Sequence, residues 1–439
     1  MQSTSCTYGE RNKRYTVGLG IGNYRPSGGR DNNGEYIMAH PRIRFGAFIA
    51  PHAAADEHPS LSLQHDLELV EHLENLEFDE AWLGEHHSGG WEISASPELT
   101  IAALSERTSR IKLGTGVVSL AYHHPFHVAD RIRQLDYLTK GRVIFGMGPG
   151  ALPSDAYMMG VPTAKVRDRM EEAIEVLVPL LNGETVTAKT DWFELQEARL
   201  QLDPYNVEGI EMAVASQVSP TGARAAGKFG VNMLSIGATS KGAFNALASN
   251  WAIAEETAAQ HGNTMDRGNW RLVAPVHVAE TREKARENVM WRLPQWIDYM
   301  AEVAAIPLAP PPGVDPVDYM IDTGFAVIGT PDDYVAQVAR LTEQSGGFGC
   351  YLHLETRWAD WAETRRSYEL IARYAIPKIN RLNEQRMASE TWLRENNKLF
   401  RGELEAAVKA KVDQHAAEKG EKDISPDVMQ AFQNVQEVK

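Results

Sequence analysis

The chain has 439 residues, 43% of them hydrophobic, with 35 glycines and 22 prolines. This is ordinary globular composition, so the chain can bury a sizeable core. Its formal net charge of −15 argues against a nucleic-acid partner, because phosphate backbones are bound by clustered Lys and Arg.

Cysteine content and hydropathy limit the location of the protein. Cys6 and Cys350 are the two cysteines, too few for a disulfide framework, and such usage suits a reducing compartment. No apolar run approaches the roughly eighteen residues of a membrane span. The N-terminus also lacks the apolar segment of a signal peptide. We therefore expect a cytoplasmic protein with no membrane contact.

In chain order, the sequence predicts three regions. Residues 1–40 are rich in Gly, Arg and Asn without periodicity, which predicts a disordered extension. Residues 41–379 alternate strand and helix patterns. Residues 380–439 are rich in Glu, Lys, Gln and Ala and predict a charged helical tail.

The middle region predicts about eight βα repeats. Strand patterns cover residues 43–49, 79–83, 111–120, 142–147, 210–215, 231–236, 272–279 and 348–354. Helical patterns begin at Ser62 and cover residues 128–138, 167–181, 220–229, 240–261 and 331–344. Eight repeats of this kind favour an α/β fold of the (β/α)8 TIM-barrel type, with an open doubly wound sheet as the alternative.

Two connections are too long for simple loops. Thr185–Thr187 and Trp192–Leu195 predict a hairpin inserted before the fifth strand. A second excursion runs from about Trp291 to Ile328. Long excursions on a barrel are commonly lids over the active site, although a disordered spacer is the simpler interpretation.

The most informative stretch is Glu85-His86-His87, which directly follows a short buried strand. In parallel α/β folds, ligands bind in the loops after the carboxyl ends of strands. A solvated loop is the competing interpretation. Adjacent histidines point to opposite sides of an extended chain, so at most one histidine of each pair reaches a shared centre.

Several further segments follow strand ends and would meet on the same barrel face. Ser216 and Ser219 precede a helix and could form a phosphate cradle, although Ser before Pro is also an ordinary helix start. Gly148 would let a flat ligand approach the backbone or simply allow a turn. Gly114 and Gly116, inside a β-branched strand, suggest a bulge or close ligand approach.

These stretches together resemble the bacterial luciferase-like flavin-dependent monooxygenases, and among them the limonene 1,2-monooxygenase-like branch. The matching segments appear in family order across most of the chain. They are residues 78–87, 111–117, 124–125, 141–150, 215–220 and 328–331.

The resemblance implies a TIM-like barrel that binds reduced FMN (FMNH2) non-covalently and reacts it with O2. The resulting flavin 4a-peroxide then oxygenates an organic substrate. His86 matches the family's catalytic histidine, and we expect His87 and Glu85 beside it to belong to the catalytic group. Such a task suits a histidine, which can carry a proton near neutral pH.

The resemblance also implies the cofactor-binding residues. Gly116-Val117 matches a position with a cis peptide beneath the flavin ring, and Ser216 and Ser219 match the loop that holds the FMN phosphate. The remaining expected contacts are Gly148, Arg224 and Gly237. Luciferases carry a cysteine and an arginine where this chain has Gly148 and Pro149, so Arg224 or backbone amides would have to supply the missing phosphate contact.

The expected substrate is a small apolar organic molecule such as a terpene, ketone or alkane. Trp91, Met147, Met158, Met159 and Trp296 are candidates for the wall of its pocket, or for ordinary core packing. No Gly-x-Gly-x-x-Gly motif enters a helix after the first strand. We therefore expect a separate NAD(P)H:flavin reductase, and the resemblance implies a homodimer.

Three alternatives remain open at this point. A deazaflavin-dependent dehydrogenase could use the same barrel face. A metal-dependent hydrolase could use Glu85 with zinc or iron ligands drawn from the five histidines His86, His87, His123, His124 and His127, although we expect no metal. A non-catalytic flavin store would bind flavin without consuming oxygen in response to substrate.

Overall fold

The computed structural model describes residues 42–50, 52–306 and 308–419. Eight parallel strands form a closed barrel, which confirms the predicted (β/α)8 fold. In order around the barrel they are β1 (Arg44–Ile49), β2 (Glu80–Leu83), β3 (Lys112–Thr115), β5 (Val143–Gly148), β8 (Glu211–Ser216), β9 (Asn232–Ser235), β10 (Arg271–Val278) and β12 (Cys350–Glu355). The barrel closes where β1 pairs with β12, with Arg44 opposite Cys350.

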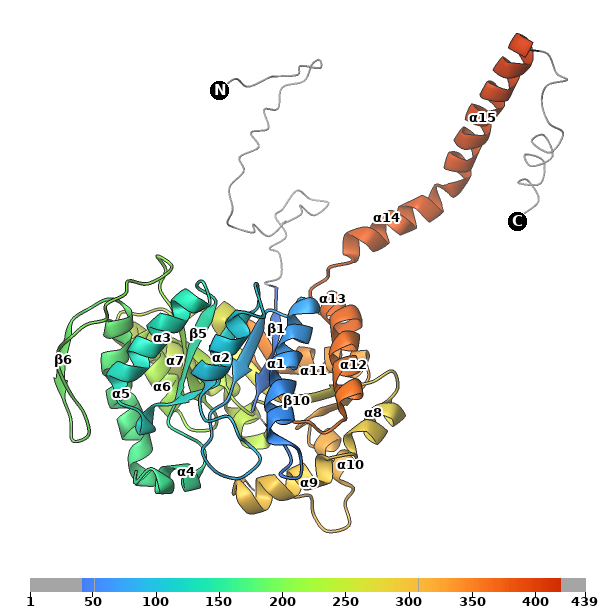
Figure 1. Cartoon of the computed structure of the whole chain (residues 1–439). Helices are drawn as coiled ribbons and strands as arrows, with labels where there is room; N and C mark the ends of the chain where they lie inside the picture. The colour runs from blue at the N-terminus through green and yellow to red at the C-terminus, as the bar shows by residue number, and fades with distance from the viewer. Residues whose placement is uncertain (1–41, 51, 307, 420–439) are drawn as a thin grey trace, which may run out of the picture. The chain divides into compact units, whose positions relative to one another are not determined.

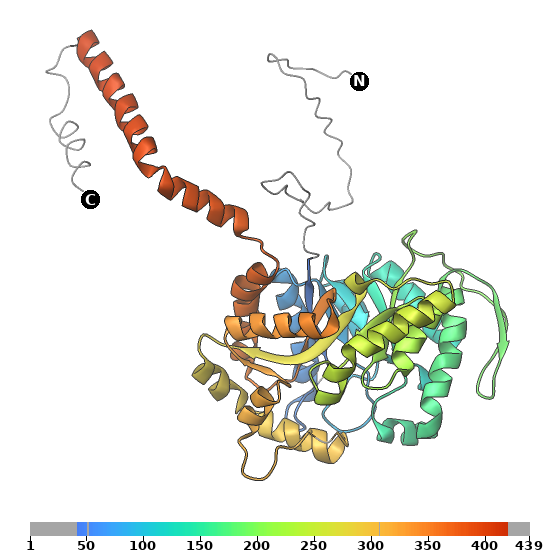
Figure 2. The same ribbon diagram turned by 180° about the vertical axis from the view of Figure 1, so that it is seen from behind.

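Helices surround these strands on the outside (Figure 1). The larger ones are α1 (Pro59–Asn75), α2 (Pro97–Ser105), α3 (Pro125–Leu138), α5 (Val166–Leu181), α6 (Thr221–Phe229), α7 (Lys241–Gln260), α11 (Pro331–Ser345) and α12 (Trp361–Leu370). In the view from behind, α7 in yellow-green and α11 in orange lie over the strands (Figure 2). Apolar side chains from both layers, such as Leu69, Ile132 and Leu177, form the main core.

Element boundaries differ from the predicted ones in two informative places. The first helix begins at Pro59 rather than Ser62, because the His58 side chain caps it by accepting from the Ser60 amide. The predicted strand at residues 111–120 is divided into β3 and the short β4 (Val118–Ser119). The peptide between Gly116 and Val117, which lies at this division, is cis.

Shorter elements complete the barrel region. They are the helices α4 (Pro153–Met158), α8 (Arg282–Val289), α9 (Leu293–Asp298), α10 (Pro316–Asp322) and α13 (Ile376–Ile379), and the strand β11 (Val327–Gly329). Three 3-10 turns cover Leu120–Tyr122, Thr163–Lys165 and Arg267–Asn269, and π-helical turns cover Tyr299–Val303 and Ile371–Ala375. Strand β11 pairs with the end of β10 outside the barrel closure.

Both predicted insertions are present. Strands β6 (Val186–Lys189) and β7 (Glu194–Ala198) form an antiparallel hairpin that stands out from the barrel (Figure 2). The second insertion, residues 291–328, contains α9, the π-turn and α10, and we call it the lid segment. Its Trp296, Tyr299 and Met300 are buried in a second core, which they share with Val289 of α8 and Trp358, so the described part of this segment is packed rather than a spacer.

The predicted tail is helical where it is described, as α14 (Glu384–Glu395) and α15 (Asn397–Lys419), and none of its side chains is buried. The predicted disordered extension at residues 1–40, and residues 420–439 of the tail, lie outside the described residues. Among the described residues, no helix is both long and apolar enough to cross a membrane.

The inside of the barrel is filled by its own small core, which includes Phe48, Trp82, Ile144 and Leu352. Cβ atoms at Gly114 and Gly146 would overlap the Trp82 ring, and one at Gly116 would lie 2.9 Å from the Phe48 ring. Gly114, Gly116 and Gly146 therefore make room for aromatic rings inside the barrel. For Gly114 this packing replaces the predicted bulge or ligand approach.

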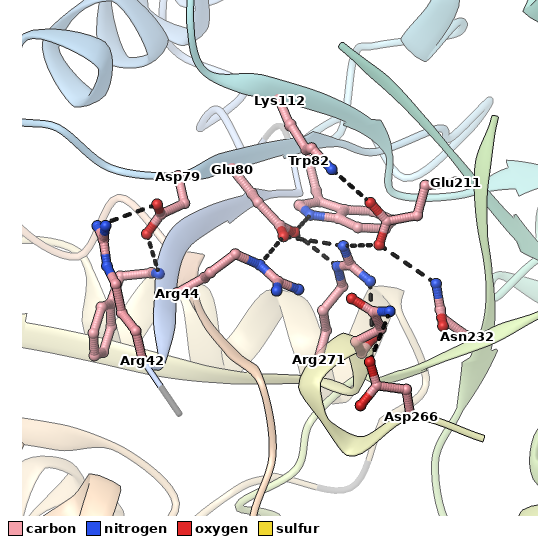
Figure 3. A network of polar contacts seen from close by, with 12 residues as sticks. Arg42, Arg44, Asp79, Glu80, Trp82, Lys112, Glu211, Asn232, Asp266 and Arg271 are labelled. Atoms are coloured by element: carbon pink, nitrogen blue, oxygen red, sulfur yellow. Dashed lines mark hydrogen bonds and ion pairs between the residues drawn. The ribbon is translucent and has the colours of Figure 1, made fainter. Parts of the chain in front are cut away.

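A buried ion-pair network closes the amino-terminal end of the barrel (Figure 3). Arg271, which begins β10, donates through Nε to Glu80 Oε2 at 2.7 Å, and Arg44 Nε donates to Glu80 Oε1 at 2.9 Å. Glu211 accepts from Arg271 and from Lys112. Both Glu80 and Arg271 are fully buried. This end of the barrel is therefore structural, and the opposite face is available for chemistry.

Candidate active site

The carboxyl end of β2 carries Glu85, His86 and His87 as predicted, and two separate clusters form around them. The histidines point in different directions, as expected for neighbours in an extended segment. His87 reaches Glu85, with Nε2 2.9 Å from Glu85 Oε1. His86 instead lies between two carboxylates that the sequence did not indicate.

The first cluster is centred on Glu85. Its Oε1 accepts from His123 Nε2 at 2.8 Å as well as from His87, and its Oε2 accepts from the Ser119 amide at 3.0 Å. Burial alone would raise the pKa of Glu85, but the hydrogen bonds from His123 and His87 outweigh it and lower the pKa to about 2. Glu85 is therefore ionised at neutral pH, and its hydrogen bond raises the pKa of His87.

The second cluster is centred on His86. Its Nε2 lies 3.0 Å from Glu92 Oε2, and its Nδ1 lies 3.2 Å from Asp155 Oδ2. Burial lowers the pKa of His86, but the Glu92 and Asp155 carboxylates outweigh it and raise the pKa to about 10. The imidazole is therefore held charged at neutral pH, with about 15% of its side chain exposed.

Asp155 ties this cluster to α4. It lies in the first turn of α4, where carboxylates are favoured by the helix dipole. Its Oδ1 accepts from the His87 amide at 3.2 Å and from the Ser88 hydroxyl at 2.5 Å. Burial opposes ionisation, but the hydrogen bonds from His86 and Ser88 lower the pKa of Asp155. Asp155 thus fixes both the ring of His86 and the backbone beside it.

The expected cofactor residues lie at other strand ends of the same barrel. Ser216 ends β8 and is buried, and its Oγ has no hydrogen-bond partner among the described residues. A buried hydroxyl without a partner is costly, and a phosphate or hydroxyl oxygen of a bound flavin would satisfy it. The residues at this position therefore fit such a cofactor.

Ser219 and Arg224 are exposed, unlike Ser216. Ser219 Oγ reaches only Thr221 Oγ1, at 3.5 Å, and Arg224, in the first turns of α6, has no ion pair within the described part of the chain. Both side chains, and the amides that begin α6, are free to contact an anion.

The structure gives a different reason for a glycine at each of the three expected cofactor positions that contain one. The Gly116–Val117 peptide is cis, as the resemblance implies. A Cβ at Gly148 would lie 2.5 Å from Val117 Cγ2, so Gly148 permits close packing against that peptide. Gly237 has φ +65°, and a Cβ there would lie 3.9 Å from Ser240 Oγ, so the backbone conformation rather than crowding favours a glycine after β9.

The expected pocket-wall residues are divided by their exposure. Met147 and Trp296 are buried, Trp91 stacks on Tyr299, and Met158 and Met159 are exposed on and after α4. A cavity of about 720 Å³ lies elsewhere, between α8, α10 and α11. Arg282 and Asp333 in its wall form an ion pair at 2.6 Å, and no residue of either histidine cluster lines it.

Sequence reasoning missed several polar groups of the site, namely Glu92, Asp155, Tyr299 and His52, and named His123 only as a possible metal ligand. Asp155 follows a strand end and could have been found by the rule that selected Glu85. Glu92 lies on the same loop as His86 but well past the strand. Tyr299 comes from the lid segment, 207 residues away from Glu92, and no local signal indicates that contact.

Comparison with known proteins identifies the class. Residues 43–347 match the family model of luciferase-like monooxygenases, and the chain belongs to this family. It is 51% identical to limonene 1,2-monooxygenase of Rhodococcus erythropolis over 340 residues, 77% of this chain and 87% of that protein. It is 44% identical to 4-hydroxyprotoasukamycin monooxygenase of Streptomyces nodosus subsp. asukaensis, over 81% of this chain and 97% of that protein.

A solved structure supports the same assignment. The oxygenating constituent of 3,6-diketocamphane monooxygenase from Pseudomonas putida, determined in complex with FMN, superposes with a TM-score of 0.64 at 25% identity. The match covers 77% of this chain and 99% of that one. The protein is therefore an oxidoreductase, a flavin-dependent monooxygenase of the limonene 1,2-monooxygenase-like branch.

Proposed function

We propose that the chain is the oxygenase component of a two-component system that uses reduced FMN and O2 to oxygenate a small apolar molecule. The observation that carries the proposal is the position of His86 after β2, between the Glu92 and Asp155 carboxylates, in a chain 51% identical to limonene 1,2-monooxygenase. A cyclic terpene is the first substrate to test, since that relative is named for one.

Reduced FMN, when bound, supplies the two electrons with which one oxygen atom of O2 enters the substrate and the other leaves as water. Ser216 and Ser219, with Arg224 and the first amides of α6, would hold the phosphate. Gly116, Val117, Gly148 and Gly237 would shape the backbone around the ring system.

The protein's own task at the reacting centre is to hold a proton and exclude water. His86 carries that proton, and the Glu92 and Asp155 carboxylates fix both of its ring nitrogens. Glu85 orients His87 and His123 beside it. The packed lid segment would keep bulk water from the centre.

The decisive experiment is an anaerobic titration of the full chain with photoreduced FMN, followed by mixing with oxygenated buffer and a terpene such as limonene. We expect tight binding of reduced FMN and one oxygenated product per flavin oxidised. Binding of a deazaflavin without binding of reduced FMN would instead favour the dehydrogenase alternative. Oxygen consumption that no substrate changes would favour a flavin store.

The partner proteins are proposed on separate grounds. The sequence has no nicotinamide-binding motif after its first strand, so a separate NAD(P)H:flavin reductase would supply the reduced FMN. We also propose a homodimer, which light scattering would report as twice the 48.7 kDa of one chain. A chain-sized particle at all concentrations would refute the dimer and leave the proposed reaction unaffected.

A further inference from the structure

Glu92 is a shared partner of the active site and the lid segment. Its Oε2 pairs with His86 Nε2 at 3.0 Å, and its Oε1 accepts a hydrogen bond from the Tyr299 hydroxyl at 2.9 Å. Glu92 is only 6% exposed, so these bonds are not replaced by water. A buried carboxylate depends on such partners to remain ionised.

Tyr299 is built to make this contact. It is buried, and its ring stacks on Trp91 with centroids 5.1 Å apart and planes at 17°. A Cβ at Gly89 would lie 2.8 Å from the Tyr299 hydroxyl, and Gly89 has φ +86°, so a glycine is needed where the ring enters. The Tyr299 side chain of the lid segment therefore packs against Gly89 and Trp91, which both lie in the loop that follows His86.

The groups that face His86 come from four parts of the chain. Asp155 approaches from α4, Glu92 and His87 from its own loop, and the Tyr299 hydroxyl from the lid segment behind Glu92. His52, after β1, lies 3.8 Å from Glu92.

His52 is a second imidazole beside Glu92, and burial disfavours its charged form. Burial lowers the pKa of His52, against the opposing effect of Glu92, and Arg357 also disfavours its charged form. His52 is therefore neutral at physiological pH, and its Nδ1 lies 3.1 Å from the backbone oxygen of Glu355. His86 is therefore the positively charged partner of Glu92.

We propose that Glu92 and Tyr299 are positioning residues for His86, so that packing of the lid segment sets the orientation and charge of the imidazole. The inference rests on the proposed function only for its consequence in the reaction. Without the Tyr299 hydroxyl, Glu92 would lose a donor that aims it at His86 and could turn toward His52. Without the Glu92 carboxylate, only Asp155 would hold the charged ring.

The direction of the effect follows from the contacts. Glu92 favours the protonated form of His86, so loss of its charge must lower the pKa of His86. Asp155 remains in both variants, so His86 should keep part of its raised pKa. Glu92→Gln should therefore act more strongly than Tyr299→Phe, which leaves the charge in place but removes its donor.

The test is a histidine side-chain NMR titration of the full chain without cofactor, with the His86 signal assigned by its loss in His86→Gln. We expect the wild type to titrate near the alkaline end of the accessible range. Tyr299→Phe should shift the His86 midpoint down by about one pH unit, and Glu92→Gln by more. The matched control is Tyr319→Phe, a half-buried tyrosine of the lid segment with no described bond to the histidine clusters, which should leave the midpoint unchanged.

Two outcomes would overturn the inference: an unchanged His86 midpoint in a folded Tyr299→Phe variant, or an equal shift in Tyr319→Phe. Since Tyr299→Phe removes a single oxygen atom, it keeps the test available if Glu92→Gln does not fold. The titration needs no flavin and no substrate, so its result stands apart from the proposed reaction.

A second readout connects the geometry to turnover. In the proposed oxygenase, Tyr299→Phe should lower the ratio of oxygenated product to hydrogen peroxide, and the loss should begin at a lower pH than in the wild type. A uniform loss at every pH would indicate a merely structural role for Tyr299 and contradict the positioning role. If no oxygenated product forms even in the wild type, the proposed function fails while the NMR result remains valid.

Discussion

His86 Nδ1 lies 3.2 Å from the Asp155 carboxylate, a contact between the loop after β2 and the first turn of α4. With Glu92 at the other ring nitrogen, this contact holds the charged imidazole in one orientation. The two carboxylates therefore preorganise the ring before any ligand binds.

We expect His86→Asn to bind reduced FMN with unchanged affinity but to form oxygenated product about 10²- to 10⁴-fold more slowly, the range for loss of a general acid. Oxygen would then be released as hydrogen peroxide. Product and peroxide are measured together in single-turnover reactions. His127→Asn, an exposed histidine on α3, is the control, and equal product yield in His86→Asn would contradict the assigned role.

The two serines should contribute unequally to cofactor binding. Ser216→Ala should weaken binding of reduced FMN by about 1–3 kcal/mol, because its buried hydroxyl has no other partner. Ser219→Ala should have a smaller effect, because its side chain is exposed to water. Anaerobic fluorescence titration measures both, with the exposed Ser249→Ala as the control. If Ser216→Ala binds as tightly as the wild type, the phosphate lies elsewhere.

The ion-pair network at the amino-terminal end of the barrel should largely determine how the stability of the fold falls in acid. Burial opposes ionisation of Glu80, but Arg271 and Arg44 lower its pKa to about 2, from an ordinary value of 4.5. A carboxylate with a lowered pKa stabilises the fold above its unfolded pKa and loses that contribution as pH falls through its folded pKa. The stabilisation by Glu80 is therefore complete above about pH 4.5 and lost on acidification toward pH 2.

Glu80→Gln tests this network by urea unfolding. At neutral pH it should lower the free energy of unfolding by about 3–5 kcal/mol, because Arg44 would lose its ion pair and buried Arg271 would keep only Glu211 as a counter-charge. The difference from the wild type should shrink as the pH falls from 4.5 toward 2. Glu106→Gln, on the exposed surface after α2, should show neither effect, and a pH-independent difference would refute the electrostatic explanation.

The Glu85 cluster allows an experimental test between the oxygenase and the metal-dependent hydrolase alternative. Glu85, His87 and His123 bring three potential ligand atoms together, but both imidazoles already pair with the carboxylate. We expect dialysis against EDTA to leave product formation unchanged and elemental analysis to find no stoichiometric zinc or iron. Loss of activity that zinc or iron restores would favour the hydrolase alternative.

The parts of the fold that could be predicted are those that depend on local patterns. The alternation of apolar strands and amphipathic helices predicted the barrel and the hairpin, and the position of Glu85 at the end of β2 predicted a site there. An irregularity at Gly116 was expected, but the division of the strand into β3 and β4 and the capping of α1 by His58 were missed. They depend on side-chain geometry that spacing does not encode.

The partners within the site could not be predicted for a related reason. His86 meets Asp155 across 69 residues, and Glu92 meets Tyr299 across 207, so each contact depends on how separate loops fold together. Gly114 presents a different difficulty. A glycine inside a β-branched strand is easily recognised in the sequence, but either ligand approach or side-chain packing can require it. Only the position of the Trp82 ring shows that the cause is packing.

The closed amino-terminal end of the barrel also limits how ligands reach the site. Because Trp82 and the Glu80–Arg271 pair fill the inside and the amino-terminal end, ligands of the proposed reaction would reach the site from the carboxyl-terminal face of the barrel. In the proposed oxygenase, flavin and product would then exchange with solvent through that same face.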